Sequence, residues 1–373
     1  MKKTLLAAAL LAGFAGSAQA ANSVTLYGIV DTGLSYQYAK MKDPVSGDTH
    51  STNQFGLRDG VQSGNRWGLR GTEDLGDGLR AVFTLESGFS INNGNGAQGG
   101  RLFGRQATIG LASDAWGQVD FGRQITTVNK YVGGIVNFGS IYAPVNGTFF
   151  STGDTTRYDN QIQYRSPSFG GVEFGVGYSF SADSLSKVDS NLWNSKAVGA
   201  PGNSATSGAK NSDFDRELNA AIKYANGPLA VAVGYDQIYL KKADPGKDPK
   251  AFIVGASYDF EVVALQLAYQ HVKHGAPFAV TNGSAAALLD AESVNSYLVG
   301  VGAPLGANGN IYGQWSLSDA KDKEKKSNAF TVGYTYDLSK RTNLYVYGNY
   351  TQDYLYVKDQ KAAQAGIGLR HRF

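Results

Sequence analysis

Apolar and polar residues alternate along most of the chain, and the first clear run begins at residue 23. In SVTLYGIVDTGLSYQY, Val24, Leu26 and Leu34 fall on one face of an extended chain. Thr25 and Asp31 fall on the opposite face. Side chains of a β-strand point alternately to its two sides. The run therefore predicts a strand with one apolar and one largely polar face.

Comparable runs recur up to the last residue of the chain. Most are about ten residues long, which is the length of a tilted strand that crosses a membrane. The pattern predicts 16 strands, over residues 23–38, 64–72, 79–90, 102–112, 117–123, 157–167, 172–181, 215–225, 229–240, 250–260, 262–273, 293–303, 310–319, 327–337, 343–353 and 363–373.

Short and long connections alternate between these runs. Residues 74–78 and 226–228 are short turns, whereas 39–63, 124–156 and 182–214 are long polar segments. Tight turns at one end and long loops at the other are typical of outer-membrane barrels. The predicted fold is therefore all-β: a transmembrane antiparallel β-barrel of 16 strands over residues 21–373. A soluble sandwich or propeller is the alternative, but its second face would rarely carry so many glycines.

Residues 1–20 do not follow the alternation. Lys2 and Lys3 precede an apolar run over residues 5–15, and the segment closes on AQA. This is the pattern of a secretory signal peptide cleaved after Ala20. The apolar run is too short to span a bilayer. A short buried helix is the alternative interpretation of this segment.

Composition supports a strand-rich chain. There are 48 Gly, 22 Tyr and 18 Phe but only 2 Met, which favours strands over helices. Mean hydropathy is −0.26, and no long apolar run follows residue 20. A membrane barrel remains compatible with these values, because it hides its apolar surface in alternate residues.

Charge and residue types exclude several classes of function. Without Lys2 and Lys3 the formal net charge falls from +3 to +1, so no global charge indicates a nucleic-acid partner. The absence of cysteine excludes disulfides, thiolate catalysis and cysteine metal sites. No carboxylate pair completes a metal site near any of the four histidines. We expect no metal, no cofactor and no enzymatic activity.

The last ten residues, QAGIGLRHRF, read as a strand that runs to the end of the chain. Ile367, Leu369 and Phe373 share one face. The last strand of a barrel pairs with the first, because an unpaired backbone group in hydrocarbon costs several kcal/mol. Residues 363–373 are therefore predicted to close against 23–38, with Phe373 at the periplasmic interface.

The sequence resembles a known family, the general trimeric porins of Gram-negative bacteria. The resemblance covers the mature chain in order, and the motifs are highly specific only as a set. They are SVTLYGIVDTGL (23–34), RWGLRGTEDLGDGLRAVFTLE (66–86), RQATIGL (105–111), GQVDFGRQ (117–124), RYDNQIQYRSPSFGG (157–171), DLSKRTNLY (337–345) and the terminal GLRHRF.

The resemblance implies a homotrimer in the outer membrane, in contact with its lipid and lipopolysaccharide, that lets ions and small hydrophilic solutes diffuse through. It also implies that Ile367, Leu369 and Phe373 form a signal read by the barrel assembly machinery. The need to close the barrel would by itself also explain why these apolar residues alternate at the end of the last strand.

The family narrows its pore with the third long loop, folded into the lumen. Here the corresponding loop follows Gln124 and is rich in Gly, Phe, Tyr, Ile and Val. Apolar residues such as Ile135, Phe138 and Phe150 need a surface to pack on, which an inward fold would provide. A position at the trimer axis or as an external lid is the alternative. The loop carries only two charges, Lys130 and Asp154, whereas related porins usually set acidic loop residues against wall arginines.

Selectivity follows from the charges that line the narrowest part of a pore. Alternation places several charged side chains on the inner face. Arg105 is ambiguous: strict alternation turns it outward, whereas the family pattern suggests a wall arginine, which would need a bulge or a position above the membrane. Weak to moderate anion preference is predicted, and the candidate pore-lining residues are Arg66, Arg70, Arg80, Glu86, Arg105, Lys130, Asp154, Arg157 and Asp159.

Two other functions remain open from the sequence. A channel specific for a sugar or an organic anion could use Tyr345 and Tyr347, which face the lumen, as part of an aromatic track. Saturation by the solute would distinguish such a channel from a diffusion pore. A structural or adhesive barrel without an open pore is the third possibility, although glycines and polar residues on the inner face argue against a filled interior.

Overall fold

The computed structural model describes residues 23–42, 47–136, 157–182, 215–240, 248–274 and 292–373. The predicted signal peptide lies outside these ranges. Phe138, Phe150, Asp154 and the greater part of the predicted third loop also lie outside them. In the described part of the chain, no helix has both the length and the apolar character needed to cross a membrane.

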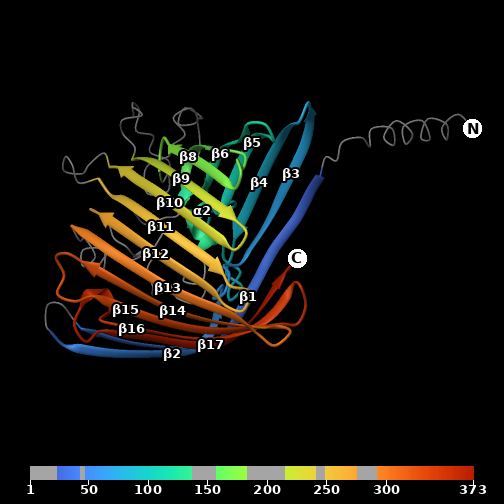
Figure 1. The fold of residues 1–373 in the computed structure, drawn as a ribbon. Coiled ribbons are helices and arrows are strands. Elements are labelled where there is room, and N and C mark those ends of the chain that lie inside the picture. Colours follow the sequence, from blue (N-terminus) through green and yellow to red (C-terminus); the bar gives the residue numbers. More distant parts are fainter. Residues whose placement is uncertain (1–22, 43–46, 137–156, 183–214, 241–247, 275–291) are drawn as a thin grey trace, which may run out of the picture.

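Antiparallel strands form almost all of the described chain (Figure 1). Alternating β-branched and aromatic residues favour this conformation. The elements are β1 (Ser23–Lys42), β2 (Thr49–Asp59), β3 (Arg66–Gly76), β4 (Leu79–Gly88), β5 (Gln106–Ser113), β6 (Gly117–Ile125), α2 (Thr127–Ile135), β7 (Arg157–Arg165), β8 (Val172–Ser179), β9 (Arg216–Asn226), β10 (Leu229–Tyr239), β11 (Lys250–Asp259), β12 (Ala264–Lys273), β13 (Ser293–Leu305), β14 (Gly309–Ala320), β15 (Ser327–Asp337), β16 (Thr342–Gln352), a 3₁₀ turn η2 (Tyr354–Tyr356) and β17 (Lys361–Arg372).

The strands close into a ring. The strands from β3 to β17 each pair with two neighbours, whereas β1 pairs with β2, β3 and β17, with Ile29 opposite Arg372. The sheet holds 17 strands, so 16 of them make the closed barrel and β2 is additional. The predicted fold, a 16-stranded antiparallel barrel, is confirmed.

The end of the chain completes this closure. Phe373 donates its backbone N–H to the Gly28 carbonyl at 3.1 Å, and Gly28 donates back to the Phe373 carbonyl at 3.0 Å. Ile367, Leu369 and Phe373 are 57%, 44% and 44% exposed on the outer face. The predicted pairing of the last strand with the first is therefore correct to the final residue.

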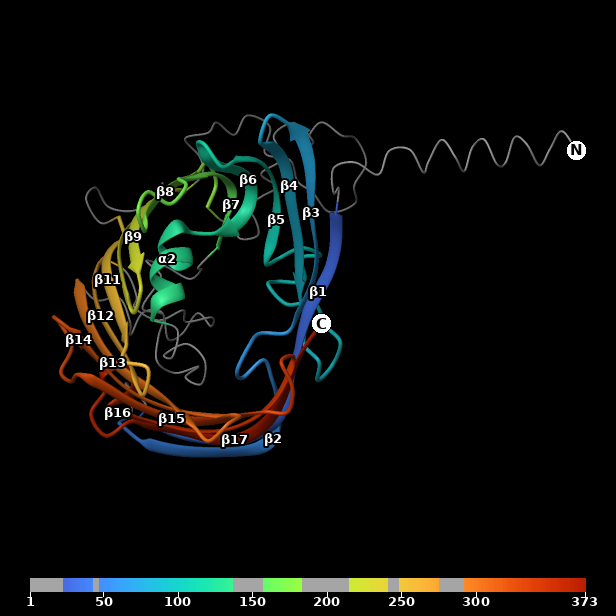
Figure 2. The ribbon, with the colours of Figure 1, turned by 45° about the vertical axis from the view of Figure 1, so that its right-hand side comes forward.

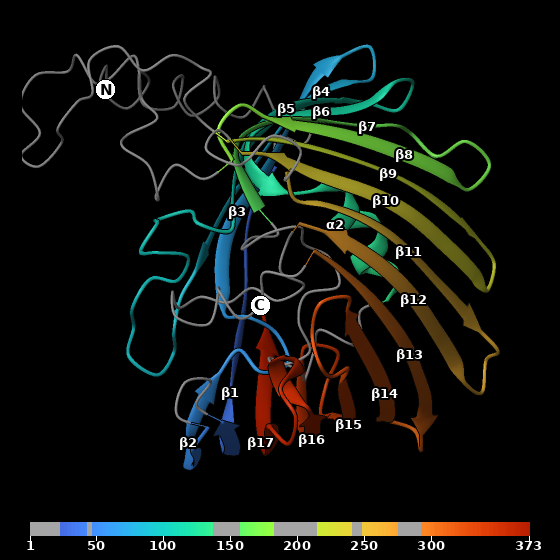
Figure 3. The ribbon, with the colours of Figure 1, turned by 90° about the vertical axis from the view of Figure 1, so that its left-hand side faces the viewer.

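β2 is the one strand that the sequence pattern missed. Residues 39–63 read as a polar loop, yet β1 extends to Lys42 and pairs with β2 along its upper half, from Thr32 opposite Asp59 to Lys42 opposite Thr49. β3 pairs with the lower half of β1. β2 and β3 therefore follow one another along β1 and are separated by residues 60–65 (Figure 3).

Hydrogen bonds on the inner face of the barrel hold the segment between β2 and β3 in place. The carboxylate of Asp31 accepts the backbone N–H of Ser63 at 2.6 Å and the hydroxyl of Tyr345 at 2.7 Å. Arg370 donates to Ser63 Oγ at 3.0 Å. Because buried acceptors need donors, the polar residues facing inward on β1, β16 and β17 hold residues 60–65 against the inner wall.

Helix α2 lies inside the ring, against β8 to β11 (Figure 2). Thr126 caps it by accepting the N–H of Asn129 on its side chain. Val128 and Val132 pack over Gly234 and Gly255, where an added Cβ would stand 2.8 and 2.9 Å from their methyl groups. The missing side chains of these glycines thus let the helix approach the wall closely. The first part of the predicted third loop is therefore inside the barrel.

Candidate pore lining and selectivity site

A cluster of charged side chains lies on the inner wall where β3, β4 and β7 meet the connection between β4 and β5. Glu86 on β4 accepts Arg105 Nε at 2.7 Å and the Tyr27 hydroxyl at 3.0 Å. The side chains of Arg105 and Glu86 are only 11% and 10% exposed. This partly buried ion pair holds Arg105 against the wall.

Asp159 forms the second centre of the cluster. Its two carboxylate oxygens accept Arg123 Nη1 at 2.6 Å and Arg101 Nη2 at 3.0 Å. Arg123 also donates from Nε to the Gly104 carbonyl at 2.7 Å. Bonds between ions of opposite charge are strong and directional, so Asp159 links the β4–β5 connection to β6 and β7.

Arg66 and Arg157 add positive charge without adding a carboxylate. Arg66 donates from Nε to the Gly64 carbonyl at 2.8 Å. Arg157 interacts electrostatically with Arg66, Arg105, Arg123 and Glu86. Among the described residues, the cluster therefore sets five guanidinium groups against two carboxylates, Glu86 and Asp159, and these seven groups together contribute net positive charge.

The structure brings together five of the nine predicted pore-lining residues: Arg66, Glu86, Arg105, Arg157 and Asp159. Arg80 lies elsewhere and pairs with Asp114, whose side chain is 86% exposed, at 2.6 Å beside the turn between β5 and β6. Arg80 precedes Glu86 by six residues on β4, which is about 20 Å along a strand. Alternation predicts the face on which a residue lies but not its height along the barrel.

Arg70 lies at the border of the cluster. It is exposed, and its guanidinium stands 5.4 Å from the centre of the Tyr27 ring, whose hydroxyl binds Glu86. Asp154 lies outside the described residues, so its place relative to the cluster stays a prediction.

Irregular backbone explains why strict alternation failed for Arg105 and missed Arg123 and Arg101. β5 begins at Gln106, so Arg105 precedes the regular strand and is free to turn toward Glu86. Arg123 follows Gly122, whose φ of +121° marks a register shift between β6 and β7. Gly122 was the one feature of the sequence that could have indicated the inward turn of Arg123. Arg101 lies outside every run of alternating residues.

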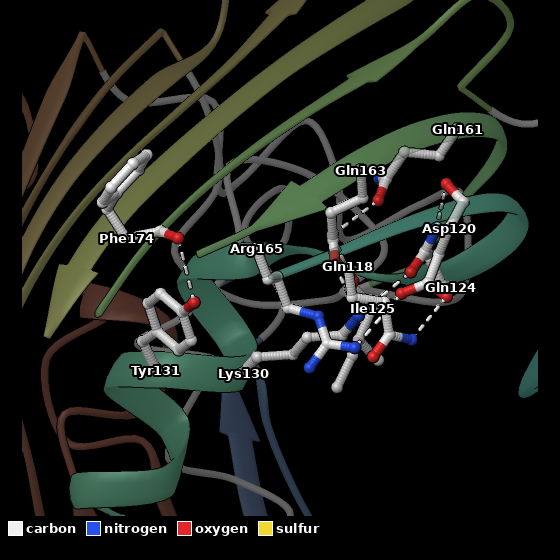
Figure 4. Close-up of polar contacts among 10 residues, drawn as sticks. All are labelled: Gln118, Asp120, Gln124, Ile125, Lys130, Tyr131, Gln161, Gln163, Arg165 and Phe174. Atoms are coloured by element: carbon white, nitrogen blue, oxygen red, sulfur yellow. Dashed lines mark hydrogen bonds and ion pairs between the residues drawn. The ribbon is translucent and has the colours of Figure 1, made fainter. Parts of the chain in front are cut away.

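Lys130 projects from α2 toward the same wall (Figure 4). Its ammonium group donates to Gln124 Oε1 at 3.0 Å and to Gln163 Oε1. Burial, and then the nearby Arg165, lower the pKa of Lys130 to about 7. Arg165 itself is paired with Asp120 at 3.2 Å. Lys130 is therefore only partly charged near neutral pH.

The wall behind α2 combines apolar and amide contacts with a few charged side chains, among them the buried Glu217, which accepts Asn219 Nδ2 at 3.0 Å, and Lys223, whose ammonium group stands 5.5 Å from the centre of the Tyr131 ring. Val128, Tyr131 and Val132 pack with Ala232 and Ile253 in one buried cluster. Asn219 Oδ1 accepts the backbone N–H of Thr127 at 2.8 Å and its hydroxyl at 2.7 Å. On this side of the lumen α2 covers the wall.

Three aromatic residues of the inner wall behave differently from a solute track. Tyr345 and Tyr347 do face inward as predicted, but they are 3% and 4% exposed. Their hydroxyl groups donate to Asp31 at 2.7 Å and to Ser35 Oγ at 3.0 Å. Tyr158 on β7 is buried against Ala182 and Ile238.

A closed 16-stranded ring with a charged inner wall and an internal helix is a pore architecture. The sequence profile of Gram-negative porins matches residues 7–354. The chain belongs to the Gram-negative porin family. As a porin it is a protein of the outer membrane, and the apolar outer face of its barrel fits that location.

Relatives of this porin cover its whole length. An outer membrane porin protein of Bordetella pertussis is 47% identical in an alignment of 404 positions that covers 100% of both chains. Outer membrane porin protein 32 of Delftia acidovorans is 32% identical over 378 residues, covering 98% of this chain and 92% of that protein.

Solved structures agree with this fold. An anion-selective porin from Comamonas acidovorans is similar with a TM-score of 0.67 at 28% identity, over 94% of this chain and 100% of that one. A trimer form of OmpT from Vibrio cholerae is similar with a TM-score of 0.60 at 15% identity, over 95% of this chain and 100% of that one. The second likeness concerns the fold alone.

Proposed function

We propose that this porin is a water-filled channel through the outer membrane for ions and small hydrophilic solutes, with a weak to moderate preference for anions. The observation that carries the proposal is the excess of guanidinium groups over carboxylates among the described residues on one wall of the lumen. A fixed positive wall raises the local concentration of anions and lowers that of cations.

Two features keep this charge effective. Arg105 and Arg123 are held by ion pairs and backbone bonds rather than swinging in solvent. The residues of α2, TVNKYVGGI, include no carboxylate that could neutralise the wall from across the lumen. The named anion selectivity of the Comamonas acidovorans porin is consistent with the same preference here.

The pore constriction is part of the proposal. α2 already occupies the lumen beside β8 to β11, and we propose that the remainder of the third loop, including Asp154, narrows the channel between the helix and the arginine wall. The selectivity roles of Arg66, Glu86, Arg105, Arg157 and Asp159 rest on this arrangement.

Assembly and partners extend the proposal. We propose a homotrimer in contact with lipopolysaccharide, in line with the trimer form of OmpT. The outward Ile367, Leu369 and Phe373 would serve the barrel assembly machinery before they close the barrel. Residues 1–20 would be removed as a signal peptide during export.

The test is the zero-current potential of the purified protein in a planar bilayer under a KCl gradient. We expect step conductance with Cl⁻ carrying most of the current. A potential of the sign for K⁺ would overturn the anion preference, and a complete lack of step conductance would overturn the channel itself. Tyr345 and Tyr347 are buried and hydrogen-bonded, so these two residues do not favour a solute-specific aromatic track.

A further inference from the structure

A polar hollow of about 520 Å³ lies where β2, β1 and β17 run side by side (Figure 3). The connection from β16 to β17, residues 353–360, adjoins this part of the wall, so the hollow is near the extracellular end of the barrel. Pockets of about 300–1,000 Å³ hold most small ligands. We call this hollow the amide pocket, and the lining residues that define it are Ser35, Gln37, Gln54, Gly56, Arg58 and Gln364.

The strand register sets three glutamines in a row across the amide pocket. Gln37 of β1 is directly opposite Gln54 of β2 on one side and Gln364 of β17 on the other. Neighbouring strands lie about 4.8 Å apart, so the row is about 10 Å wide. Within the described chain no hydrogen bond joins the three side chains to one another, and their bonds go to other groups. The row is therefore not a closed ladder of amides.

The next row toward the periplasm is made of small residues. Ser35 is buried on the inner face and lies between Gly56 and Gly366 in the register. A Cβ added at Gly56 would meet nothing within 4 Å, so the space above this glycine is open. Val61, from the segment between β2 and β3, and Asn92, from the connection between β4 and β5, complete the border. The small row is therefore the floor of the pocket.

One wall of the pocket holds an unsatisfied acceptor. Gln364 Nε2 donates to the Tyr347 hydroxyl at 2.7 Å and to Ser35 Oγ at 3.0 Å. Gln364 Oε1 is buried and accepts no hydrogen bond from any described group, and the residue is only 5% exposed. Buried acceptors need donors. Because Gln364 borders the pocket, a ligand that carries O–H groups would satisfy it.

The charges around the pocket balance. Of the described residues that line it, two are charged, Arg58 and Asp59. Arg58 donates to Gln37 Oε1, and Asp59 accepts the backbone N–H of Ile91 at 3.0 Å. With one charge of each sign the lining favours neither anions nor cations. An amide both donates and accepts hydrogen bonds, as a hydroxyl group does. A neutral ligand with several hydroxyl groups therefore matches this lining.

We infer that the amide pocket binds a neutral mono- or disaccharide at the mouth of the channel. One sugar hydroxyl donates to Gln364 Oε1, and others exchange hydrogen bonds with Gln37, Gln54 and Arg58. Val61 offers an apolar surface to the C–H face of the sugar ring. The inference rests on the proposed channel function, because a sugar in this pocket lies on the path of a diffusing solute.

The experiment is saturation-transfer NMR of the purified, folded protein in detergent with sucrose as the probe, paired with single-channel recording of the same preparation. We expect saturable binding, and a saturable fall in conductance beyond the effect of sucrose on the bulk solution. Polyethylene glycol of equal hydrodynamic size accepts hydrogen bonds but hardly donates them, so it should give neither.

The paired readouts separate this inference from the proposed function. A conducting channel without saturable sucrose binding would overturn the saccharide site and leave the diffusion channel standing. Saturable sucrose binding by a protein without step conductance would support the site and overturn the channel.

Two pairs of variants locate the binding. Gln37→Leu with Gln54→Leu should weaken sucrose binding by about 10-fold, because two hydrogen-bonding groups are lost. Asn53→Leu is the matched control, since Asn53 is an exposed amide on the opposite face of β2. Gly56→Leu fills the open space and should weaken binding at least as much. Gly348→Leu adds the same side chain on the outer wall, where a Cβ has its nearest contact at 3.9 Å, and should bind normally.

Each variant is compared only after it shows the heat-resistant mobility of a folded barrel. Equal sucrose affinity of the wild-type protein and the double leucine variant would overturn the inference. Unchanged binding in Gly56→Leu would place the sugar elsewhere and overturn it as well. Tighter binding of glucuronate than of glucose would show that the pocket selects anions rather than neutral sugars.

Discussion

The two halves of the lumen wall differ in what faces the water. From β3 to β7 the wall carries a guanidinium-rich cluster organised by Glu86 and Asp159. From β8 to β11 it is covered by α2, whose apolar side chains pack on small wall residues. Selectivity and width are therefore assigned to opposite sides of one lumen, so each can be changed without rebuilding the other.

The largest effect is expected on the charged side. Arg66→Ala combined with Arg157→Ala should lower the permeability ratio of Cl⁻ to K⁺ by about 5-fold or more. A unit charge at about 8 Å in a medium of dielectric constant about 40 contributes about 1 kcal/mol. The measurement is the zero-current potential in a KCl gradient. Arg80→Ala removes a charge at the turn-side rim and should change the ratio much less; equal effects of both changes would show that the cluster does not govern selection.

Removing a negative charge from the cluster should raise the permeability ratio of Cl⁻ to K⁺. Glu86→Gln keeps an acceptor for Tyr27 and Arg105 but removes one negative charge from the cluster. We expect Cl⁻ preference to rise by about 2- to 5-fold, measured in the same way. Glu173→Gln is the control, because Glu173 pairs with Lys223 at 3.0 Å away from the cluster. A fall in Cl⁻ preference for Glu86→Gln would contradict the positive wall.

The helix-covered side should respond in conductance rather than in selectivity. Gly255→Val places a side chain under Val132, where even a Cβ would stand at 2.9 Å, and overpacking of this kind costs about 1–3 kcal/mol. With α2 displaced, single-channel conductance should rise by less than about twofold, because the helix fills only part of the lumen. Gly348→Val, where an added Cβ has its nearest contact at 3.9 Å, is the control. Unchanged conductance in Gly255→Val would mean that α2 does not limit the width.

The smallest expected effect is a pH dependence of the Cl⁻ preference, which links Lys130 on α2 to the charged wall. The pKa of Lys130 is lowered to about 7, mainly by burial, so docked α2 binds fewer protons than undocked α2 between about pH 7 and pH 10.5. Docking therefore strengthens as pH rises through that window and levels off at its weakest below about pH 7, where Lys130 is charged in both states. Between pH 8 and pH 6, Cl⁻ preference should rise by less than about twofold.

Lys130→Met provides the check on this pH step. It removes the titrating group, so its pH profile of the zero-current potential should be flat between pH 6 and pH 8. Lys223→Met, at a lysine paired with Glu173, should keep the wild-type profile. An identical step in Lys130→Met would assign the titration to another group.

The sequence predicted the barrel because its signal is long-range and simple. Period-two alternation defines the inner face of each strand, so Glu86 was placed correctly on that face. The strand pairing of Phe373 followed from the need to satisfy every backbone group in the membrane. Both predictions depend on regular backbone.

The predictions that failed concern residues in irregular backbone, or they depend on the height of a residue along the barrel axis. Arg123 turns inward after the register shift at Gly122, and Arg105 precedes the first regular residue of β5. Arg80 shares a face with Glu86 but lies near the turn. β2 is polar along most of its length, and its residues are mostly exposed, so only its pairing with an extended β1 identifies it as a strand.

The mutual hydrogen bonds between Gly28 and Phe373 have a consequence for biogenesis. One edge of β1 is among the first parts of the chain to be synthesised, but its partner is the last. That edge stays open throughout translation and export, and an open strand edge invites pairing with other chains. A chain of this design cannot fold progressively as it emerges. The edge loses this hazard only when residues 361–373 pair with it.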